Sequence, residues 1–261
     1  MQKILFTGAR SGIAASVIKK LLNKDYYIYV TVHTEKQLDI VKENYKDYKN
    51  IECFKLDITS DEDIDKINSL DIDILVLNAA IANGGAICEI PIIKVEETFD
   101  VNIIGNIKLI QIAYKIFNRK KSGKIIIMSS LSGLMPINFL GVYSASKAGL
   151  IKLAQALRSE LKLIDSNVLV KLIEPGFYYT GFNQVMFDNK YGWMHYHTYF
   201  NKVINKIKTK ESFISNYIEK KNLNSIVTKI VSAIIDDNDK FIYRAPLSQV
   251  LVAKVYEFFK N

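Results

Sequence analysis

A tyrosine and a lysine stand four positions apart at the start of a segment that reads as a helix. In the sequence VYSASK, Tyr143 and Lys147 are one helical turn apart, so their side chains share a face. A free phenol ionises near pH ~10 and is a poor acid or base at neutral pH. A nearby cation favours the phenolate and lowers the pKa. The pair indicates either an exposed surface pair or a general acid and base that works near neutrality.

A second candidate for chemistry is the sequence TGARSGIA, which joins the first expected strand to the first expected helix. Gly8 permits a tight turn, and Gly12 permits close backbone approach. The N–H groups at the start of a helix attract phosphate, although an ordinary strand-to-helix turn is the alternative. We predict nucleotide contacts at Gly8, Arg10, Ser11, Gly12 and Ile13.

Two further strand ends bear on which nucleotide would bind. Asp57, followed by Ile58, is placed to accept a hydrogen bond from an adenine amino group, and a turn or N-cap aspartate is the alternative. The second strand has no carboxylate at its end before Glu35. His33, together with Arg10, is instead placed to face a 2′-phosphate, which favours NADP(H) over NAD(H). An exposed loop histidine is the alternative for His33.

These residues lie where strand-like and helix-like segments alternate. We expect strands at residues 3–9, 26–32, 51–58, 72–79, 123–130, 167–176 and 240–245, and helices at 12–24, 35–47, 60–70, 95–117, 142–164, 224–237 and 246–261. The alternation predicts an α/β fold of the Rossmann type, a doubly wound parallel sheet with helices on both faces. No linker or repeat precedes residue 176, so residues 1–261 are expected to form a single domain.

The composition excludes several classes of protein. The chain has 261 residues, 49% of them hydrophobic, which is typical of a globular protein. No apolar run approaches the ~18 residues of a membrane span, and the N-terminus does not read as a secretory signal. The net charge of +8 comes from scattered lysines, so no nucleic-acid partner is expected. Cys53 and Cys88 form no disulfide framework or metal spacing, which favours a cytoplasmic setting.

Six motifs in this order resemble the short-chain dehydrogenase/reductase family, in its single-domain branch. They are TGARSGIA, LNAA (Leu77 to Ala80), VNIIG with Asn102, SSLSG with Ser130, YSASK with Tyr143 and Lys147, and PGFYYT (Pro175 to Thr180). Each motif is weak alone, but six in order across residues 1–180 are specific. Ala14 and Ala80 replace glycines of the family pattern, and Leu77 replaces a polar residue.

The resemblance implies the role of each site residue. Its catalytic set is Asn102, Ser130, Tyr143 and Lys147. Tyr143 would be the acid for carbonyl reduction and the base for alcohol oxidation, and Ser130 would hold the substrate oxygen. Asn102 would anchor a water of a proton relay. The remaining implied cofactor contacts are Lys147 on the nicotinamide ribose, Asn78 and Ala79 near the adenosine, and Pro175, Gly176 and Thr180 over the nicotinamide.

Residues 177 to about 220 should then form a variable substrate lid. The first part of this segment is rich in aromatic residues without a clear period, which suits an apolar pocket, a satellite core or a dimer contact. The aromatics expected there are Phe177, Tyr178, Phe182, Phe187, Tyr191, Trp193, Tyr196, Tyr199 and Phe200. His195 and His197 lack a third ligand nearby, so no metal site is predicted.

The sequence thus predicts an NAD(P)(H)-dependent oxidoreductase that moves a hydride between nicotinamide and a ketone or secondary alcohol, with NADPH and an apolar substrate favoured. The alternatives are a catalytically silent nucleotide-binding sensor or interaction protein, and a lyase or epimerase on the same scaffold. The resemblance also implies a homodimer or homotetramer through helices near residues 96–118 and 142–161. The apolar terminal helix is expected to cap a pocket, join a subunit contact or touch a membrane surface.

Overall fold

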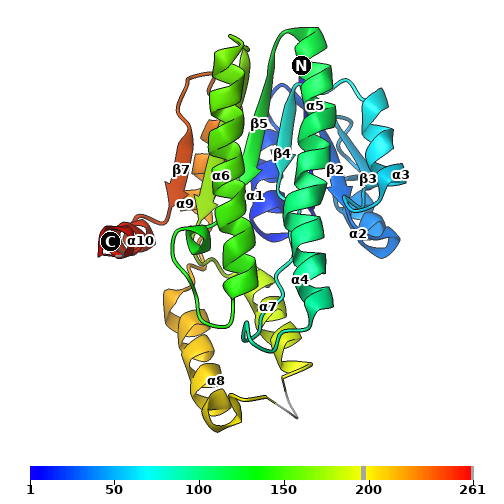
Figure 1. The fold of residues 1–261 in the computed structure, drawn as a ribbon. Helices are drawn as coiled ribbons and strands as arrows, with labels where there is room; N and C mark the ends of the chain where they lie inside the picture. Colours follow the sequence, from blue (N-terminus) through cyan, green and yellow to red (C-terminus); the bar gives the residue numbers. More distant parts are fainter. Residues whose placement is uncertain (195–197, 260–261) are drawn as a thin grey trace.

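One parallel sheet of seven strands organises the chain in this computed structural model, which describes residues 1–194 and 198–259 (Figure 1). The strands are β1 (Gln2–Phe6), β2 (Tyr26–Val32), β3 (Ile51–Lys55), β4 (Ile74–Leu77), β5 (Gly123–Met128), β6 (Val168–Pro175) and β7 (Ile242–Ala245). Their order across the sheet is β3-β2-β1-β4-β5-β6-β7. The order reverses between β1 and β4, and α/β sheets of this kind bind ligands at such a point, beyond the carboxyl ends of the strands.

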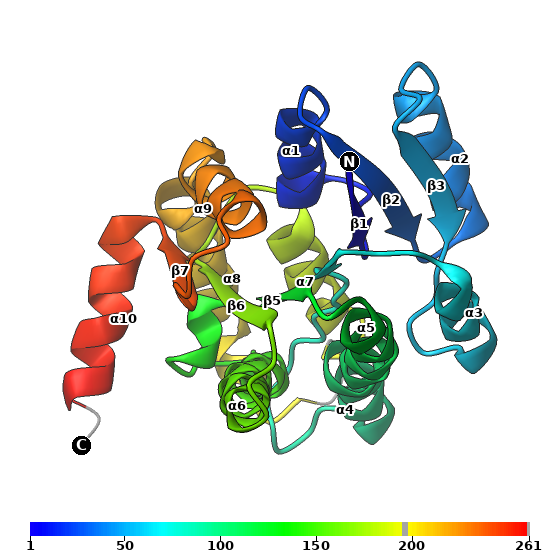
Figure 2. The ribbon, with the colours of Figure 1, turned by 90° about the horizontal axis from the view of Figure 1, so that it is seen from above.

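Helices cover both faces of the sheet (Figure 2). The described α-helices, of which α1, α2 and α9 cover one face and α5 and α6 the other, are α1 (Gly12–Leu21), α2 (Glu35–Tyr45), α3 (Asp61–Asp65), α4 (Ile92–Phe99), α5 (Asn106–Lys120), α6 (Gly141–Leu163), α7 (Phe182–Tyr191), α8 (Ile204–Phe213), α9 (Asn224–Ile235) and α10 (Leu247–Phe259). Alternate residues of β1 show the two layers, because Ile4 and Phe6 join a core with α1, α2 and α9, whereas Leu5 joins a core with α5 and α6. The predicted doubly wound fold is confirmed.

The long helix expected over residues 95–117 is interrupted. A π-helical turn, Asp100–Gly105, separates α4 from α5. Within it, Asn102 is fully buried, and its side-chain amide pairs with both backbone groups of Ile81 at 2.9 Å. A π turn changes where the following side chains point, and such turns are frequent at functional sites.

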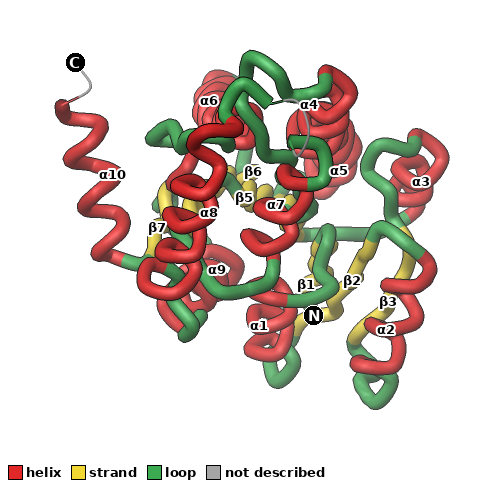
Figure 3. The backbone as a smooth tube through the Cα atoms, turned by 90° about the horizontal axis from the view of Figure 1, so that it is seen from below, coloured by secondary structure: helices red, strands yellow, loops and turns green. Residues whose placement is uncertain are grey.

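The segment after β6, residues 177–220, lies beyond the carboxyl ends of the strands, where the sequence predicts a lid, and it is called the lid below (Figures 1 and 3). It contains α7, for which the sequence showed no clear period, then α8 and a π-helical turn at Ile214–Ile218. The two ends of this segment meet, since the backbone N–H of Lys220 donates to the Phe177 carbonyl at 3.0 Å. Gln249 on α10 accepts from the N–H of Phe177 at 2.7 Å and donates to the carbonyl of Ile218 at 2.9 Å.

The last helix, α10, makes limited contact with the body of the protein. Val250 and Ala253 pack against Leu131, while Leu251 and Val255 are each 56% exposed. In Figure 3, α10 stands to one side of the sheet and the lid. None of the described helices combines the length and the apolarity needed to cross a bilayer.

Candidate active site

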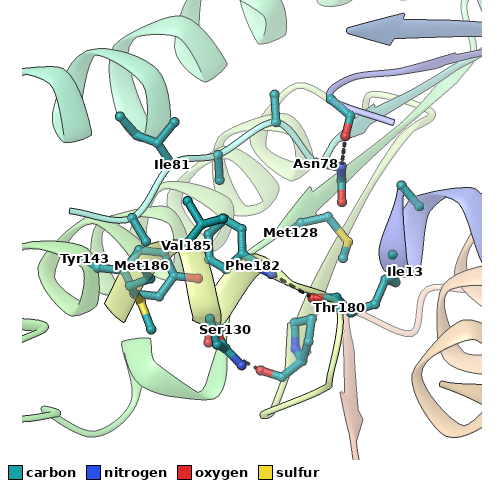
Figure 4. Close-up of a pocket in the computed structure, with 18 of the residues that line it drawn as sticks. Ile13, Asn78, Ile81, Met128, Ser130, Tyr143, Thr180, Phe182, Val185 and Met186 are labelled. Carbon is teal, nitrogen blue, oxygen red and sulfur yellow. Dashed lines mark hydrogen bonds between the residues drawn. The ribbon is translucent and has the colours of Figure 1, made fainter. Parts of the chain in front are cut away.

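A cleft of about 730 Å³ opens at the carboxyl ends of the strands, between the sheet and the lid. Residues from motifs far apart in the sequence line it, and the glycine turn, the end of β4, the start of α6 and the loop after β6 all contribute. Figure 4 shows Ile13, Asn78 and Thr180 toward one end, and Tyr143 and Met186 toward the other. All residues expected to contact a cofactor line this one cleft: Gly8, Arg10, Ser11, Gly12, Ile13, His33, Asp57, Ile58, Asn78, Ala79, Tyr143, Lys147, Pro175, Gly176 and Thr180.

The glycine turn needs both of its glycines. Gly8 and Gly12 have φ angles of +62° and +64°, in the region that residues with a Cβ rarely adopt. A Cβ on Gly8 would lie 2.7 Å from the Cα of Ala79, and one on Gly12 would lie 3.0 Å from the Cβ of Thr180. The turn therefore packs directly against the LNAA motif on one side and the PGFYYT motif on the other.

Hydrogen bonds between Thr7 and Asn78 fix the turn to β4. The Thr7 hydroxyl accepts from the backbone N–H groups of Asn78 and Ala79, both at 3.0 Å. The Asn78 amide donates to the carbonyls of Thr7 and Gly8 at 2.9 and 3.0 Å. Because the Thr7 and Asn78 side chains bond to backbone atoms, the cleft has a fixed shape between β1 and β4, where the strand order reverses.

The start of α1 presents donors to the cleft. Ser11 is the N-cap residue, and its side chain makes no capping hydrogen bond to the first turn. Gly12, Ile13 and Ala14, which begin the helix, line the cleft. Uncapped N–H groups at the positive end of a helix suit a phosphate. Arg10 is exposed beside them and has no carboxylate partner among the described residues.

The structure pairs His33 with Asp57, a contact that the sequence did not reveal. The His33 Nε2 atom lies 3.3 Å from the Asp57 Oδ2 atom, and Thr59 donates two hydrogen bonds to the other Asp57 oxygen, at 2.9 and 2.7 Å. Partial burial raises the Asp57 pKa, but the hydrogen bonds from Thr59 and the contact with His33 outweigh it and leave the pKa below its usual value. Arg10 is thus the cation at this end of the cleft that lacks a carboxylate partner among the described residues.

Tyr143 and Lys147 lie in the first turns of α6, as the spacing predicts. The Lys147 Nζ atom lies 5.7 Å from the centre of the Tyr143 ring, and it donates to the carbonyl of Met128 at 3.0 Å. Both side chains are buried, with 9% of Tyr143 and 4% of Lys147 exposed. The pair is therefore part of the cleft wall and not an exposed surface pair.

The effect expected of Lys147 on the Tyr143 pKa is not what the structure gives. Burial raises the Tyr143 pKa, and a hydrogen bond with the Ser130 hydroxyl opposes this rise. Burial also lowers the Lys147 pKa to about 8. Both charged forms lose hydration in the same space, and that loss outweighs their mutual attraction. The Tyr143 phenol is therefore protonated at neutral pH, and its raised pKa makes it a weaker acid than a free tyrosine.

Ser130, at the end of β5, places its hydroxyl beside that of Tyr143. Its hydroxyl lies 3.4 Å from the Pro175 carbonyl and accepts from the Ser132 N–H at 3.1 Å. The neighbouring Ser129 donates to the carbonyl of Lys147 at 2.8 Å, which joins this strand end to α6. Two hydroxyls, of Ser130 and Tyr143, therefore meet on the cleft wall (Figure 4).

Asn102 does not line the cleft. Its side chain is occupied by the backbone of Ile81 and by the Ser146 hydroxyl, to which its amide donates at 3.0 Å. Ser146 in turn donates to the carbonyl of Tyr143 at 2.8 Å. The geometry links Asn102 to α6 and to the cleft wall at Ile81, without direct access for a substrate.

Apolar side chains of the lid cover the catalytic end of the cleft. The Phe182 ring lies 5.9 Å from the Tyr143 ring, centre to centre, and Met186 and Phe187 pack in the same cluster. Val185 and Met186 of α7, and Ile137 and Leu140 from the loop before α6, also line this end of the cleft and were not predicted. The spacing of Phe182, Val185 and Met186, three and four residues apart, is a helical signal for the first two. No comparable signal marks Ile137 and Leu140.

The aromatic residues of the lid have different surroundings. Phe177, Tyr178 and Phe182 line the cleft. Tyr199 is 86% exposed, and the Phe200 ring meets the Phe139 ring edge to face, with centres 5.2 Å apart. A Cβ on Gly85 would clash with the Trp193 ring, so that ring packs on backbone. Tyr196, His195 and His197 lie outside the described residues, and the rest of the described chain contains no cluster of potential metal ligands.

Comparison with known proteins gives consistent results. Residues 2–190 match the family model described as short chain dehydrogenase. The chain is 32% identical over 193 residues to the probable short-chain type dehydrogenase/reductase VdlC of Helicobacter pylori, a match covering 71% of this chain and 68% of that protein. It is 30% identical over 188 residues to the NADPH-dependent 3-dehydrocapnine reductase of Ornithobacterium rhinotracheale, covering 67% and 65%.

The fold is also similar to solved structures. A short chain dehydrogenase/reductase from Burkholderia phymatum, in complex with NAD, superposes with a TM-score of 0.83 at 16% identity, covering 98% of this chain and 93% of that one. At this level of identity the likeness concerns the fold.

Proposed function

The chain belongs to the short-chain dehydrogenase family of oxidoreductases, and we propose that it reduces a ketone to a secondary alcohol with NADPH, or runs the reverse reaction. The observation that carries the proposal is the meeting of Tyr143, Lys147 and Ser130 in the same cleft as the uncapped start of α1. One end of the cleft suits a phosphate and the other suits proton transfer.

The residues at the phosphate end fit a nicotinamide dinucleotide. Gly8 and Gly12 have no side chain at positions where a Cβ would clash with neighbouring residues, so the backbone of the turn stays accessible. The first turn of α1 offers N–H donors that no side chain caps. Arg10 supplies a positive charge that no described carboxylate neutralises, which supports NADP(H) over NAD(H). The relative from Ornithobacterium is named as an NADPH-dependent reductase, whereas the Burkholderia protein of similar fold was solved with NAD, so the relatives alone do not decide between the two cofactors.

The proposed step moves one proton at a defined atom. A reduced nicotinamide, when bound, supplies the hydride to the carbonyl carbon. The Tyr143 hydroxyl donates its proton to the carbonyl oxygen, and the Ser130 hydroxyl donates a hydrogen bond to the same oxygen. The Lys147 ammonium stabilises the phenolate left behind until water returns a proton. In the reverse direction the phenolate accepts the alcohol proton. Asn102 acts by positioning Ile81 and the start of α6.

The lid supports an apolar substrate. Phe182, Val185 and Met186 face the end of the cleft that holds Tyr143 (Figure 4). Closing apolar groups over the reacting carbonyl excludes water and strengthens the hydrogen bonds made there. A ketone with an apolar body fits this end of the cleft.

We also expect a homodimer or homotetramer. Ile92 on α4 is 69% exposed and Ile93 is 59% exposed, which leaves an apolar surface beside α6. Light scattering on the purified protein would measure the assembly directly.

The decisive experiment measures NADPH and NADH oxidation with a panel of ketones, for the parent protein and for Tyr143→Phe. General acid catalysis contributes about 10²–10⁴-fold, so Tyr143→Phe should lose that factor in kcat while the Kd for NADPH stays unchanged. Retained turnover would remove Tyr143 from the mechanism. NADPH binding without turnover of any ketone by the parent protein would favour the alternative, a nucleotide-binding sensor.

A further inference from the structure

A second cavity, of about 240 Å³, lies beside the active-site cleft under α8. Ile137, Leu140 and Phe177 line both spaces, so the two cavities are neighbours that share these side chains. Sites for whole small molecules usually measure about 300–1,000 Å³. The second cavity is therefore smaller than a usual site for a whole small molecule, and it adjoins the larger cleft.

The walls of the second cavity are apolar. Ile207, which is 9% exposed, faces it from α8, and Val203 and Ile214 flank it along the chain. Phe187 of α7 closes the side that adjoins the substrate end of the cleft. A surface of this kind gains free energy by covering hydrocarbon, at about 25 cal/mol per Å² of apolar area removed from water.

The outer rim of the same cavity is positive. Lys206 and Lys210 are one turn apart on α8, line the cavity, and are exposed at their ends. Neither has a carboxylate partner among the described residues. Glu211 also lines the cavity, but its carboxylate is bound by Lys190, which is fully buried, and by the Tyr191 hydroxyl at 2.6 Å. The cavity therefore combines apolar walls with two unneutralised cations.

We propose that this cavity holds the apolar tail of a carbonyl substrate whose far end carries an anionic group, a carboxylate or a phosphate, between Lys206 and Lys210. The inference deepens the proposed function and rests on it. With its tail against Ile207 and Phe187, the substrate extends past Ile137 and Leu140 and brings its carbonyl group to Tyr143. The stems of the two lysines cover the apolar chain while their ammonium groups stay in water.

The test compares oxo fatty acids with their methyl esters and with an alkyl phosphate that carries the same ketone. The two exposed lysines should favour the anion by roughly two- to thirtyfold in kcat/KM at low salt, which corresponds to about 0.4–2 kcal/mol for two exposed ion pairs. Lys206→Gln combined with Lys210→Gln should bring the ratio of acid to ester close to one. Lys229→Gln on α9, an exposed lysine far from the cavity, is the matched control and should keep the ratio. The phosphate arm shows which of the two anions is preferred.

A second measurement separates this inference from the proposed function. Calorimetry with a saturated fatty acid, which has no ketone to reduce, should show binding that the double lysine variant weakens. Turnover of ketones with equal kcat/KM for acid and ester, and no effect of the lysine changes, would overturn the tail site and leave the oxidoreductase intact. Fatty acid binding lost in the lysine variant, without turnover of any ketone, would support the tail site and overturn the proposed function.

Discussion

The sheet with its loops, residues 1–176, and the lid, residues 177–220, hold their residues in place by different means. In the sheet region the site is fixed by backbone, as where Asn78 bonds to the carbonyls of Thr7 and Gly8, and Lys147 to that of Met128. In the lid the two ends also meet through backbone, but side-chain pairs join its parts, as where Asn183 donates to Glu219 at 2.7 Å. Backbone contacts depend little on residue identity at the partner position, whereas side-chain pairs depend on both residues.

The difference suggests separate roles for the sheet region and the lid. In the proposed function, proton transfer and nucleotide binding require fixed positions, which the sheet region would supply. The choice of substrate would depend on side chains that line the cleft, which the lid would supply. The boundary of the family match, at residue 190, falls inside the lid, within α7.

Two glycines test this comparison most strongly. Gly8 and Gly181 both have positive φ, at +62° and +81°, but a Cβ on Gly181 would meet nothing within 4 Å. Gly181→Ala should cost only the backbone strain, about 1–2 kcal/mol. Gly8→Ala adds a clash with Ala79 and should cost more, with loss of NADPH binding. Urea unfolding and nucleotide titration would measure both, and equal effects of the two changes would contradict the distinction.

Breaking the ion pair inside the lid should have the next largest effect. Glu211→Gln leaves the Lys190 ammonium buried without its partner, and such a loss typically costs about 3–5 kcal/mol. Hydrogen exchange should show the loss in α7 and α8, with the sheet unchanged. Asp61→Asn, which breaks the exposed pair with Lys108, is the control and should cost less than about 1 kcal/mol. Uniform destabilisation of lid and sheet would show that the two regions unfold together.

Arg10 tests the nucleotide end of the sheet region. Arg10→Ala should raise the Kd for NADPH by roughly tenfold, about 1.4 kcal/mol, and leave the Kd for NADH unchanged. Arg119→Ala, at an exposed position near the end of α5, should change neither value. Equal weakening of both nucleotides by Arg10→Ala would remove the basis for a preference for NADP(H).

The pH dependence of stability is the smallest effect expected from any single residue. Burial lowers the pKa of Lys147 and of Lys190 to about 8, compared with about 10.4 in the unfolded chain. Folding therefore favours the neutral lysines, and the cost of burying their charge is fully present below pH 8 and declines as pH rises toward 10.4. The free energy of unfolding should increase between about pH 8 and 9.5, on the order of 1 kcal/mol per lysine. Urea unfolding would measure it, and Lys147→Met should reduce the slope.

Much of the fold was accessible from the sequence because its signals are local. The apolar strands, the glycine turn and the spacing of Tyr143 and Lys147 each depend on residues close together in the chain. The final strand at residues 240–245 and the terminal helix were also predicted, and the structure has both, as β7 and α10. The π-helical turn was missed because it depends on a contact between Asn102 and Ile81, distant in sequence.

The electrostatics of the site were less predictable for the same reason. The effect of Lys147 on Tyr143 was judged from proximity alone, whereas burial by Phe182 and Met186 of the lid reverses the sign. The partner of His33 is Asp57, on another strand end. Burial and pairing depend on the assembled tertiary structure, and a single sequence without its fold does not specify them.

The amide side chain of Gln249 joins α10 to the lid beside the cleft. Gln249 bonds to Phe177 at the start of the lid and to Ile218 near its end, and few side chains of its own helix pack on the body of the protein. Force applied to α10 is therefore transmitted to the mouth of the cleft. A ligand or antibody that displaces α10 is therefore expected to alter access to the cleft, whatever it does at the sheet.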